Sequence, residues 1–293
     1  MWVERFAPAK VNLFLHVGPV EADGYHPVCS LMVFADVGDV VRLGPAAAMT
    51  FGLTGPFAEI LGSAADNLVI RARDRLIVTA SSPVAPFELV LDKRLPIAAG
   101  LGGGSADAAA ALVLIGGHLA EQGNAVDPRR LALIARTLGA DVTACVASKS
   151  VIGRGRGDDV EPAPAMPPLD AVLVNPRALS PTGTVYRAFD ALPAGPGADE
   201  RVLPSVFASV AEVVDFLGET RNDLEHPAVA LQPLIGEVLG ALARAPEALF
   251  TRMSGSGATC FALCADRTDA NRLAARLATD QPGWWVRSCR FGG

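Results

Sequence analysis

The sequence predicts an α+β fold in two domains, and three observations support this prediction. The 293 residues suffice for two ordinary domains. Short alternating or apolar runs typical of strands are interspersed with segments of helical periodicity. Between them, residues 153–159 alternate glycine with charge and residues 161–168 are rich in proline, which marks a domain boundary. We therefore expect domains at 1–157 and 158–293.

The N-terminal part predicts an antiparallel meander. From Lys10 to Val17 apolar and polar residues alternate at the period of a strand, with Lys10 and Asn12 on the same face. Asp23-Gly24 has the composition of a tight turn. Further strands are expected over 30–35 and 39–43.

Helices and one strand follow in the predicted first domain. Asp66 or Asn67 can cap a helix that begins at Leu68. Residues 87–92 predict a strand, and the alanine-rich segment after the glycines predicts a helix to about residue 122. Asp127-Pro128 opens a further helix, and Gly139 ends it.

The second half continues the α+β pattern. We expect an irregular linker over 192–198 and a loop of small residues over 252–259. The expected strands are 170–176, 260–263 and 285–287, and the expected helices are 180–189, 204–217, 228–244 and 269–279.

The composition indicates a soluble globular protein. Hydrophobic residues make up 51% and charged residues 19% of the chain. A net charge of −6 argues against binding to nucleic acid or an acidic membrane, but small phosphorylated ligands remain compatible. We find no leader and no apolar run near the roughly twenty residues of a membrane span, so we expect a cytoplasmic protein. We also expect it to be a monomer or a homodimer.

The five cysteines do not predict a metal site or a disulfide framework. They are odd in number and scattered, and Cys260 and Cys264 have no second pair that would complete a zinc set. We expect reduced, mostly buried thiols.

The segment 95–112 predicts a phosphate site. Four glycines in five positions, 100–104, precede a strong helix former without a spacer, so bare N–H groups and the positive end of a helix point at the same place. Asp107, in the first turn of this helix, is either a metal ligand or a charge that complements the helix dipole. The expected nucleotide-binding residues here are Pro96, Gly100, Gly102, Gly103, Gly104 and Ser105.

Other interpretations of this segment remain open. It lacks the lysine of a Walker loop and has Ser105 in place of the third glycine of a dinucleotide fingerprint. The segment could be a plain glycine-rich connection. The protein could also be a non-catalytic nucleotide-binding module, or an NAD-dependent oxidoreductase with Glu121 at the ribose. Further along, Asp141 stands in an apolar run, so its charge needs a partner or a cavity.

Three separated blocks resemble the GHMP kinases: Pro8–Leu13, Pro96–Ala110 and Ser254–Ala258. The resemblance implies a two-domain fold, with an N-terminal domain like ribosomal protein S5 domain 2 and a C-terminal ferredoxin-like domain. It also implies an ATP- and Mg²⁺-dependent transfer of a phosphoryl group to an alcohol. Lys10 and Asp141 match the family's catalytic lysine and aspartate, which would be each other's partners.

Shorter segments resemble the members that act on a diphosphocytidyl methylerythritol, in the non-mevalonate route to isoprenoids. The resemblance then implies transfer to the 2-hydroxyl of that substrate. The segments are 22–26, 66–69, 138–142 and 181–183.

The same resemblance implies binding roles for individual residues. Tyr25 and Tyr186 would lie on the two faces of the cytosine, with His26 at its edge, an arrangement that suits a pyrimidine. Asn12 would contact the methylerythritol and Asn67 would lie near the adenine. Ser105 is the candidate protein ligand of Mg²⁺.

Three residues depart from the family's pattern: Met32, Ala106 and Thr143 stand where an aromatic, a serine and a proline are familiar. Met32 and Thr143 affect the expected substrate pocket, and Ala106 affects metal binding. A homoserine- or mevalonate-type kinase of the same family is the nearest alternative.

Overall fold

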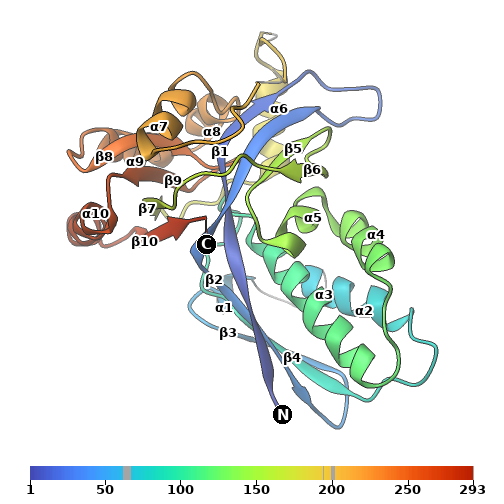
Figure 1. The fold of residues 1–293 in the computed structure, drawn as a ribbon. Coiled ribbons are helices and arrows are strands. Elements are labelled where there is room, and N and C mark those ends of the chain that lie inside the picture. Colours follow the sequence, from blue (N-terminus) through green and yellow to red (C-terminus); the bar gives the residue numbers. More distant parts are fainter. Residues whose placement is uncertain (62–66, 194, 199–201, 293) are drawn as a thin grey trace. The chain divides into compact units, whose positions relative to one another are not determined.

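The computed structural model describes residues 1–61, 67–193, 195–198 and 202–292 and confirms the α+β class (Figure 1). The chain forms two compact units, each built from several segments. Unit 1 comprises Met1–Ala9, Gly38–Ile97 and Gly102–Ser148, and unit 2 comprises Lys10–Val37, Ala98–Leu101 and Lys149–Gly293. These units differ from the continuous domains 1–157 and 158–293, because packing draws residues 10–37 and 98–101 into unit 2. The boundary between family domains stays a prediction.

Unit 1 contains a small sheet and a group of helices. The second half of β2 (Val28–Pro45) pairs antiparallel with β4 (Phe87–Asp92), and β3 (Thr50–Thr54) pairs with β4 in parallel. β4 confirms the strand predicted over 87–92, and every second residue of it is buried. The remaining elements of this unit are the first part of β1 (Val3–Val17), α1 (Ala58–Leu61), α2 (Leu68–Ile77), α3 (Gly103–Glu121), α4 (Pro128–Leu138) and α5 (Ala140–Ala147).

The cap predicted at Asn67 is confirmed, and Asp127 caps the helix that was predicted to begin at Asp127-Pro128. Asn67 Oδ1 accepts from the Val69 N–H at 2.9 Å, and Asp127 Oδ1 accepts from the Arg129 N–H at 2.7 Å. Each cap satisfies one of the N–H groups that a helix start leaves without a partner. Asp66, the alternative cap of α2, lies outside the described residues.

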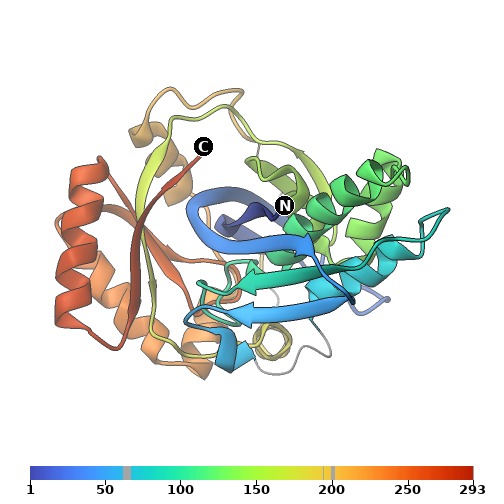
Figure 2. The ribbon, with the colours of Figure 1, turned by 90° about the horizontal axis from the view of Figure 1, so that it is seen from below.

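Unit 2 is an antiparallel sheet in the order β2-β10-β7-β9-β8, with helices beside it. β7 is buried along its whole length, and Figure 2 shows α10 beside β10. The elements are β5 (Val151–Arg154), β6 (Asp159–Pro162), β7 (Leu169–Asn175), α6 (Thr182–Asp190), α7 (Val210–Gly218), α8 (Glu225–Leu231), α9 (Leu234–Ala243), β8 (Ala248–Met253), β9 (Cys260–Cys264), α10 (Arg267–Asp280) and β10 (Trp285–Phe291).

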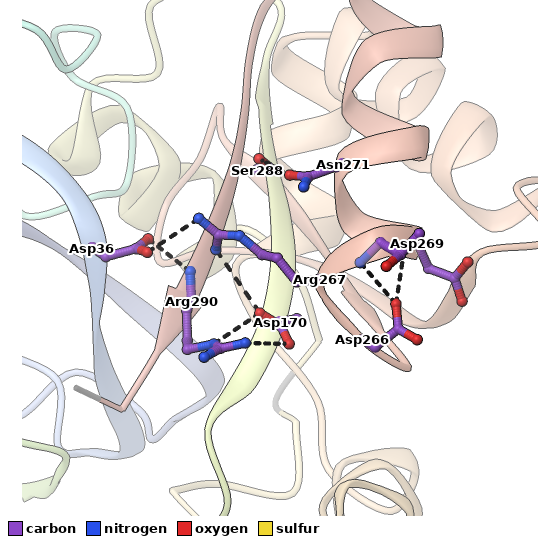
Figure 3. Close-up of polar contacts among 9 residues, drawn as sticks. Asp36, Asp170, Asp266, Arg267, Asp269, Asn271, Ser288 and Arg290 are labelled. Carbon is purple, nitrogen blue, oxygen red and sulfur yellow. Dashed lines mark hydrogen bonds and ion pairs between the residues drawn. The ribbon is translucent and has the colours of Figure 1, made fainter.

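A charge cluster ties four elements of unit 2 together (Figure 3). Arg290 on β10 donates to both carboxylate oxygens of Asp170 on β7, each at 2.9 Å. The Arg290 N–H donates to Asp36 on β2 at 2.7 Å, and Arg267 at the start of α10 lies 3.3 Å from the same carboxylate. The charges of the two arginines and the two aspartates cancel. The cluster therefore stabilises the packing of β2, β7, β10 and α10 against one another.

Several elements differ from the sequence-based prediction. β2 is one strand where two were expected, and Gly38 within it has no room for a side chain, since a Cβ would lie 2.2 Å from the Ala7 carbonyl oxygen. The helix expected over 228–244 is divided into α8 and α9 at Gln232-Pro233, because proline lacks the N–H that continues a helix. Part of the predicted boundary segment forms the β5–β6 hairpin.

Helix α3 corrects the expectation about apolar runs. Its 19 residues are long and apolar enough to cross a membrane, yet half of its apolar stretch is buried inside the protein. Asp107 in its first two turns is paired with Lys93 of the same unit. These contacts are those of a core helix in a globular unit.

The five cysteines are free and buried, as predicted. Burial raises the pKa of the Cys264 thiol to about 12 and shifts the pKa of Cys260 and Cys289 upward as well. The thiols are therefore protonated near neutral pH.

Candidate active site

The three motif blocks of the sequence meet in unit 2. The segment Ala98–Leu101 lies between β1 and the loop after β8. The Lys10 N–H donates to the Leu101 carbonyl at 2.8 Å, and the Thr259 N–H donates to the Ala99 carbonyl at 3.0 Å. Ser254 Oγ donates to the Gly100 carbonyl at 2.8 Å. Residues far apart in the chain thus form one hydrogen-bonded group.

Gly100 is required by this close approach. Its φ is +72°, and a Cβ built on it would lie 2.2 Å from the Ser254 carbonyl oxygen and 2.9 Å from the Gly257 nitrogen. An L-residue would be strained by the backbone angle and would also collide with backbone atoms. The structure shows that this glycine leaves room for the loop 254–257, and its part in nucleotide binding stays a prediction.

Lys10 and Asn12 occupy one face of β1, as predicted, and both are buried, with Lys10 5% exposed. Lys10 Nζ donates to Asn12 Oδ1 at 2.9 Å. Asn12 is held in turn: its N–H donates to Ser254 Oγ at 3.1 Å, and its Nδ2 donates to Ser30 Oγ at 2.7 Å. The sequence analysis did not single out Ser30. Its position in an otherwise apolar strand, 30–35, was a signal that it points at another polar group.

Tyr25, His26 and Tyr186 also belong to unit 2. The rings of His26 and Tyr186 lie 5.0 Å apart between centroids, and Tyr25 is 55% exposed. His26 Nδ1 lies 2.8 Å from the Gly18 carbonyl oxygen and Nε2 lies 3.2 Å from Asp190 Oδ1. Both ring nitrogens thus face protein oxygens. His26 and Tyr186 are brought together, and a role in holding a base stays a prediction.

Arg156 is a neighbour of Tyr25 that the sequence analysis missed. Its guanidinium lies 4.2 Å from the centre of the Tyr25 ring and pairs with Asp23. Hydrogen bonds from the Tyr25 N–H and from Arg156 lower the pKa of the Asp23 carboxyl. Arg156 lies in the turn between β5 and β6, and no spacing in the sequence linked it to Tyr25.

Gly102, Gly103 and Gly104, the last glycines of the segment 95–112, stand at the start of α3 in unit 1. Gly102 is the N-cap residue with φ 58°, and no side chain caps this end of α3 in the described structure. The N–H groups of the first turn, which includes Ser105, therefore have no intrahelical acceptor and favour an anion. Gly104 is exposed and Ser105 is half-buried, whereas Pro96 is buried.

A buried ion triad lies beside this helix start. Lys93 Nζ donates to Asp39 Oδ2 at 2.5 Å and to Asp107 Oδ2 at 2.8 Å, and a Cβ on Gly103 would lie 3.0 Å from Lys93 Nζ. Asp39 Oδ1 also accepts the N–H groups of Arg94 and Leu95. Asp107 Oδ2 is thus engaged by Lys93, whereas its Oδ1 is buried without a hydrogen-bond partner among the described residues, and both roles considered for Asp107 stay predictions.

The triad shifts the pKa of its members. Burial, reinforced by the charge of Asp39 and opposed by Lys93, raises the pKa of Asp107 to about 8. Burial lowers the pKa of Lys93, but the attraction of Asp107 and Asp39 outweighs it, so the net shift is upward.

Asp141 lies in the first turn of α5 and is half-buried. The preceding helix ends before Gly139, as predicted, and the apolar run that contains Asp141 begins a new helix, whose dipole favours a negative charge in its first turn. Asp141 and Asn67 belong to unit 1 and Lys10 to unit 2. Their convergence stays a prediction.

The three departures from the family's pattern are placed as follows. Met32 and Ala106 are buried, and the Thr143 hydroxyl is buried without a hydrogen-bond partner among the described residues. In the same residues, no group of three or more His, Cys, Asp or Glu side chains is arranged to hold a metal ion.

Comparisons with known proteins identify the family of this chain. Sequence models described as the GHMP kinases N terminal domain and the GHMP kinases C terminal match residues 67–149 and 205–282. A 4-diphosphocytidyl-2-C-methyl-D-erythritol kinase of Caulobacter vibrioides (strain NA1000 / CB15N) is 54% identical over 99% of this chain and 100% of its own length. The chain belongs to the GHMP kinase family.

Solved structures show the same relationship. A crystal structure of 4-(cytidine 5'-diphospho)-2C-methyl-D-erythritol kinase is similar with a TM-score of 0.78, at 32% identity over 99% of this chain and 100% of that chain. Homoserine kinase from Cytophaga hutchinsonii, at 21% identity and a TM-score of 0.70 over 100% of this chain and 94% of that chain, shares the fold. This GHMP kinase is therefore a phosphotransferase with a small-molecule substrate, and its family implies the use of ATP.

Replacement of Gly100 tests the close approach in unit 2. Gly100→Ala should lower the free energy of unfolding by about 2 kcal/mol or more, because the Cβ meets backbone atoms at a positive φ. Gly117→Ala in α3 is the matched control, since nothing lies within 4 Å of the Cβ site there. It should be neutral or stabilise the helix by up to about 1 kcal/mol. Equal effects in denaturant unfolding would contradict the packing argument.

The raised pKa of Asp107 predicts a pH dependence of stability. The folded state holds the proton up to about pH 8, whereas the unfolded carboxyl releases it near its ordinary value of 3.8. This contribution to stability is therefore complete below the unfolded value and is lost as the pH rises through 8. Denaturant unfolding at pH 5, 7 and 9 should show that Asp107→Asn removes part of the decline. A decline equally steep in the variant would show that Asp107 is ionised throughout.

Proposed function

We propose that this kinase transfers the γ-phosphoryl group of ATP to the 2-hydroxyl of 4-diphosphocytidyl-2-C-methyl-D-erythritol, giving the 2-phosphate and ADP. The observation that carries the proposal is full-length similarity, 54% over 99% of the chain, to a kinase named for that substrate. The junction of the three motif blocks in unit 2 supports it. The reaction belongs to the non-mevalonate route to isoprenoid precursors, and we place the enzyme in the cytoplasm, as monomer or homodimer.

Lys10 and Asp141 would be the catalytic residues. Asp141, in the first turn of α5, would accept the proton of the substrate hydroxyl. The Lys10 ammonium, hydrogen-bonded to Asn12, would stabilise negative charge at the reacting oxygens.

The nucleotide would be held by the start of α3. The first-turn N–H groups of the segment Gly102–Ser105 supply donors for phosphate oxygens, with Gly100 and Pro96 shaping the segment before it. Asn67, at the start of α2, would lie near the adenine. Mg²⁺ neutralises the phosphate charges and needs few protein ligands, and the half-buried Ser105 hydroxyl is the candidate among these residues.

The cytidine end would be bound by residues of unit 2. Tyr25 and Tyr186 would lie on the two faces of the cytosine, and Asn12 would contact the methylerythritol. His26 would read the edge of the base. Because Nε2 of His26 now faces the partly exposed Asp190, reading by the ring would exchange that carboxylate for the base.

A kinase assay tests the proposal directly. The purified chain should convert ATP and the cytidylylated substrate to ADP and the 2-phosphate with Mg²⁺ and not without it. Asp141→Asn should reduce turnover by at least about a hundredfold while ATP binding, measured by calorimetry, changes little, because the base is lost and the fold is kept.

Two controls accompany the assay. CMP should compete with the substrate, which a homoserine- or mevalonate-type kinase would not show. Asp280→Asn, a change at the exposed end of α10, should leave turnover unchanged. Full turnover in Asp141→Asn would overturn the assignment of the base, and turnover unaffected by millimolar CMP would argue against the proposed substrate.

A further inference from the structure

The hydrogen bonds around Ser30 have a fixed direction. The Ser30 hydroxyl carries one hydrogen, and its oxygen lies 2.6 Å from the Phe14 carbonyl oxygen, which can only accept. The hydrogen therefore points at Phe14. Towards Asn12, 2.7 Å away, the Ser30 oxygen can only accept, so the Asn12 amide must present its Nδ2 group to Ser30.

The orientation of the Asn12 amide determines which of its atoms faces Lys10. With Nδ2 towards Ser30, Oδ1 of Asn12 faces the other way and accepts from Lys10 Nζ at 2.9 Å. An ammonium only donates, so the reversed amide would place a donor against it. Ser30, Asn12 and Lys10 are 2%, 4% and 5% exposed, which leaves little access for water to replace a lost partner.

Two further contacts hold Asn12 in this position. Its backbone N–H donates to Ser254 Oγ. Its Oδ1 lies 3.2 Å from the position of a Cβ on Gly255, so a side chain there would press on the amide. The position of Asn12 is thus fixed by the loop 254–257, and the orientation of its amide is fixed by Ser30.

We propose that Ser30 is a positioning residue for phosphoryl transfer, acting through the amide of Asn12 to aim the Lys10 ammonium. The inference deepens the proposed function and rests on it, because Lys10 matters to turnover only if it takes part in the transfer. Without the Ser30 acceptor the amide can rotate, and Lys10 loses its directed partner. A displaced ammonium stabilises the charge that develops during transfer less well. The fall in kcat should therefore be larger than the change in the KM for ATP.

A double-mutant cycle tests the pathway through Asn12. Ser30→Ala should lower kcat about tenfold and change the KM for ATP less than about twofold, the size expected for one buried hydrogen bond. In the Asn12→Ala background the same change should lower kcat less than about twofold, because nothing remains for Ser30 to orient. Ser288→Ala is the matched control: its hydroxyl also bonds an asparagine, Asn271, at 2.7 Å on the surface of unit 2 (Figure 3), and kcat should not change.

An equal loss of kcat from Ser30→Ala in both backgrounds would overturn the proposal. Where Ser30→Ala does not fold, Ser30→Cys takes its place in the cycle, because it keeps the volume and weakens the acceptor.

A measurement without substrate separates this proposal from the proposed function. In ¹⁵N-labelled protein the side-chain amide resonances of Asn12 should move in Ser30→Ala and stay in place in Ser288→Ala. Unchanged Asn12 resonances in Ser30→Ala would overturn the inference. Moved resonances in a protein that does not phosphorylate the cytidylylated substrate would contradict the proposed function and leave the orientation of Asn12 established.

Discussion

The close approach between Gly100 and the loop 254–257 is the constraint on which the candidate site depends. Ser254 Oγ donates to Gly100 and accepts from the Asn12 N–H, so one hydroxyl joins the glycine segment to β1. The approach is possible because residue 100 has no side chain. Burial of these groups makes the junction costly to break, since each lost partner leaves a polar group without water.

In the glycine-rich segment 95–112, the residues on the two sides of the Leu101–Gly102 bond are held by contacts in different units. Ala98–Leu101 is held in unit 2 by backbone hydrogen bonds, and α3 is held in unit 1 by the pair between Asp107 and Lys93. The Lys93 ammonium lies close beside Gly103, so the start of α3 combines a helix dipole with a nearby buried cation. The helix dipole favours an anionic ligand, whereas the charge of Lys93 is offset by Asp39 and Asp107.

Much of the fold could be predicted from the sequence because local signals were strong. The cap at Asn67, the helix that begins at Asp127-Pro128, the strand β4 and the glycine segment before α3 all appeared where expected. What could not be predicted depends on contacts between distant residues. The continuity of β2 through Gly38 depends on Ala7, and the division of unit 2 into segments depends on strand pairing.

The site shows the same contrast. Motif resemblance identified Lys10, Asn12 and the glycines, because those residues stand in recognisable blocks. Ser30, Lys93 and Arg156 escaped notice, since their roles arise from partners 18, 14 and 133 positions away. Asp141 was proposed from the same resemblance, and the helix end at Gly139 was predicted, but the apolar run after it did not show that a new helix begins there.

We expect Lys10 and Asp141 to act on the same transferred phosphoryl group, and a crystal structure tests this most directly. The crystal would contain the chain, Mg²⁺, a non-hydrolysable ATP analogue and the cytidylylated substrate. We predict that Asp141 lies within about 3.2 Å of the acceptor hydroxyl, with Lys10 Nζ within about 4 Å of the hydroxyl or the γ-phosphate. Either side chain more than about 6 Å from the reacting atoms, with both ligands bound, would contradict it.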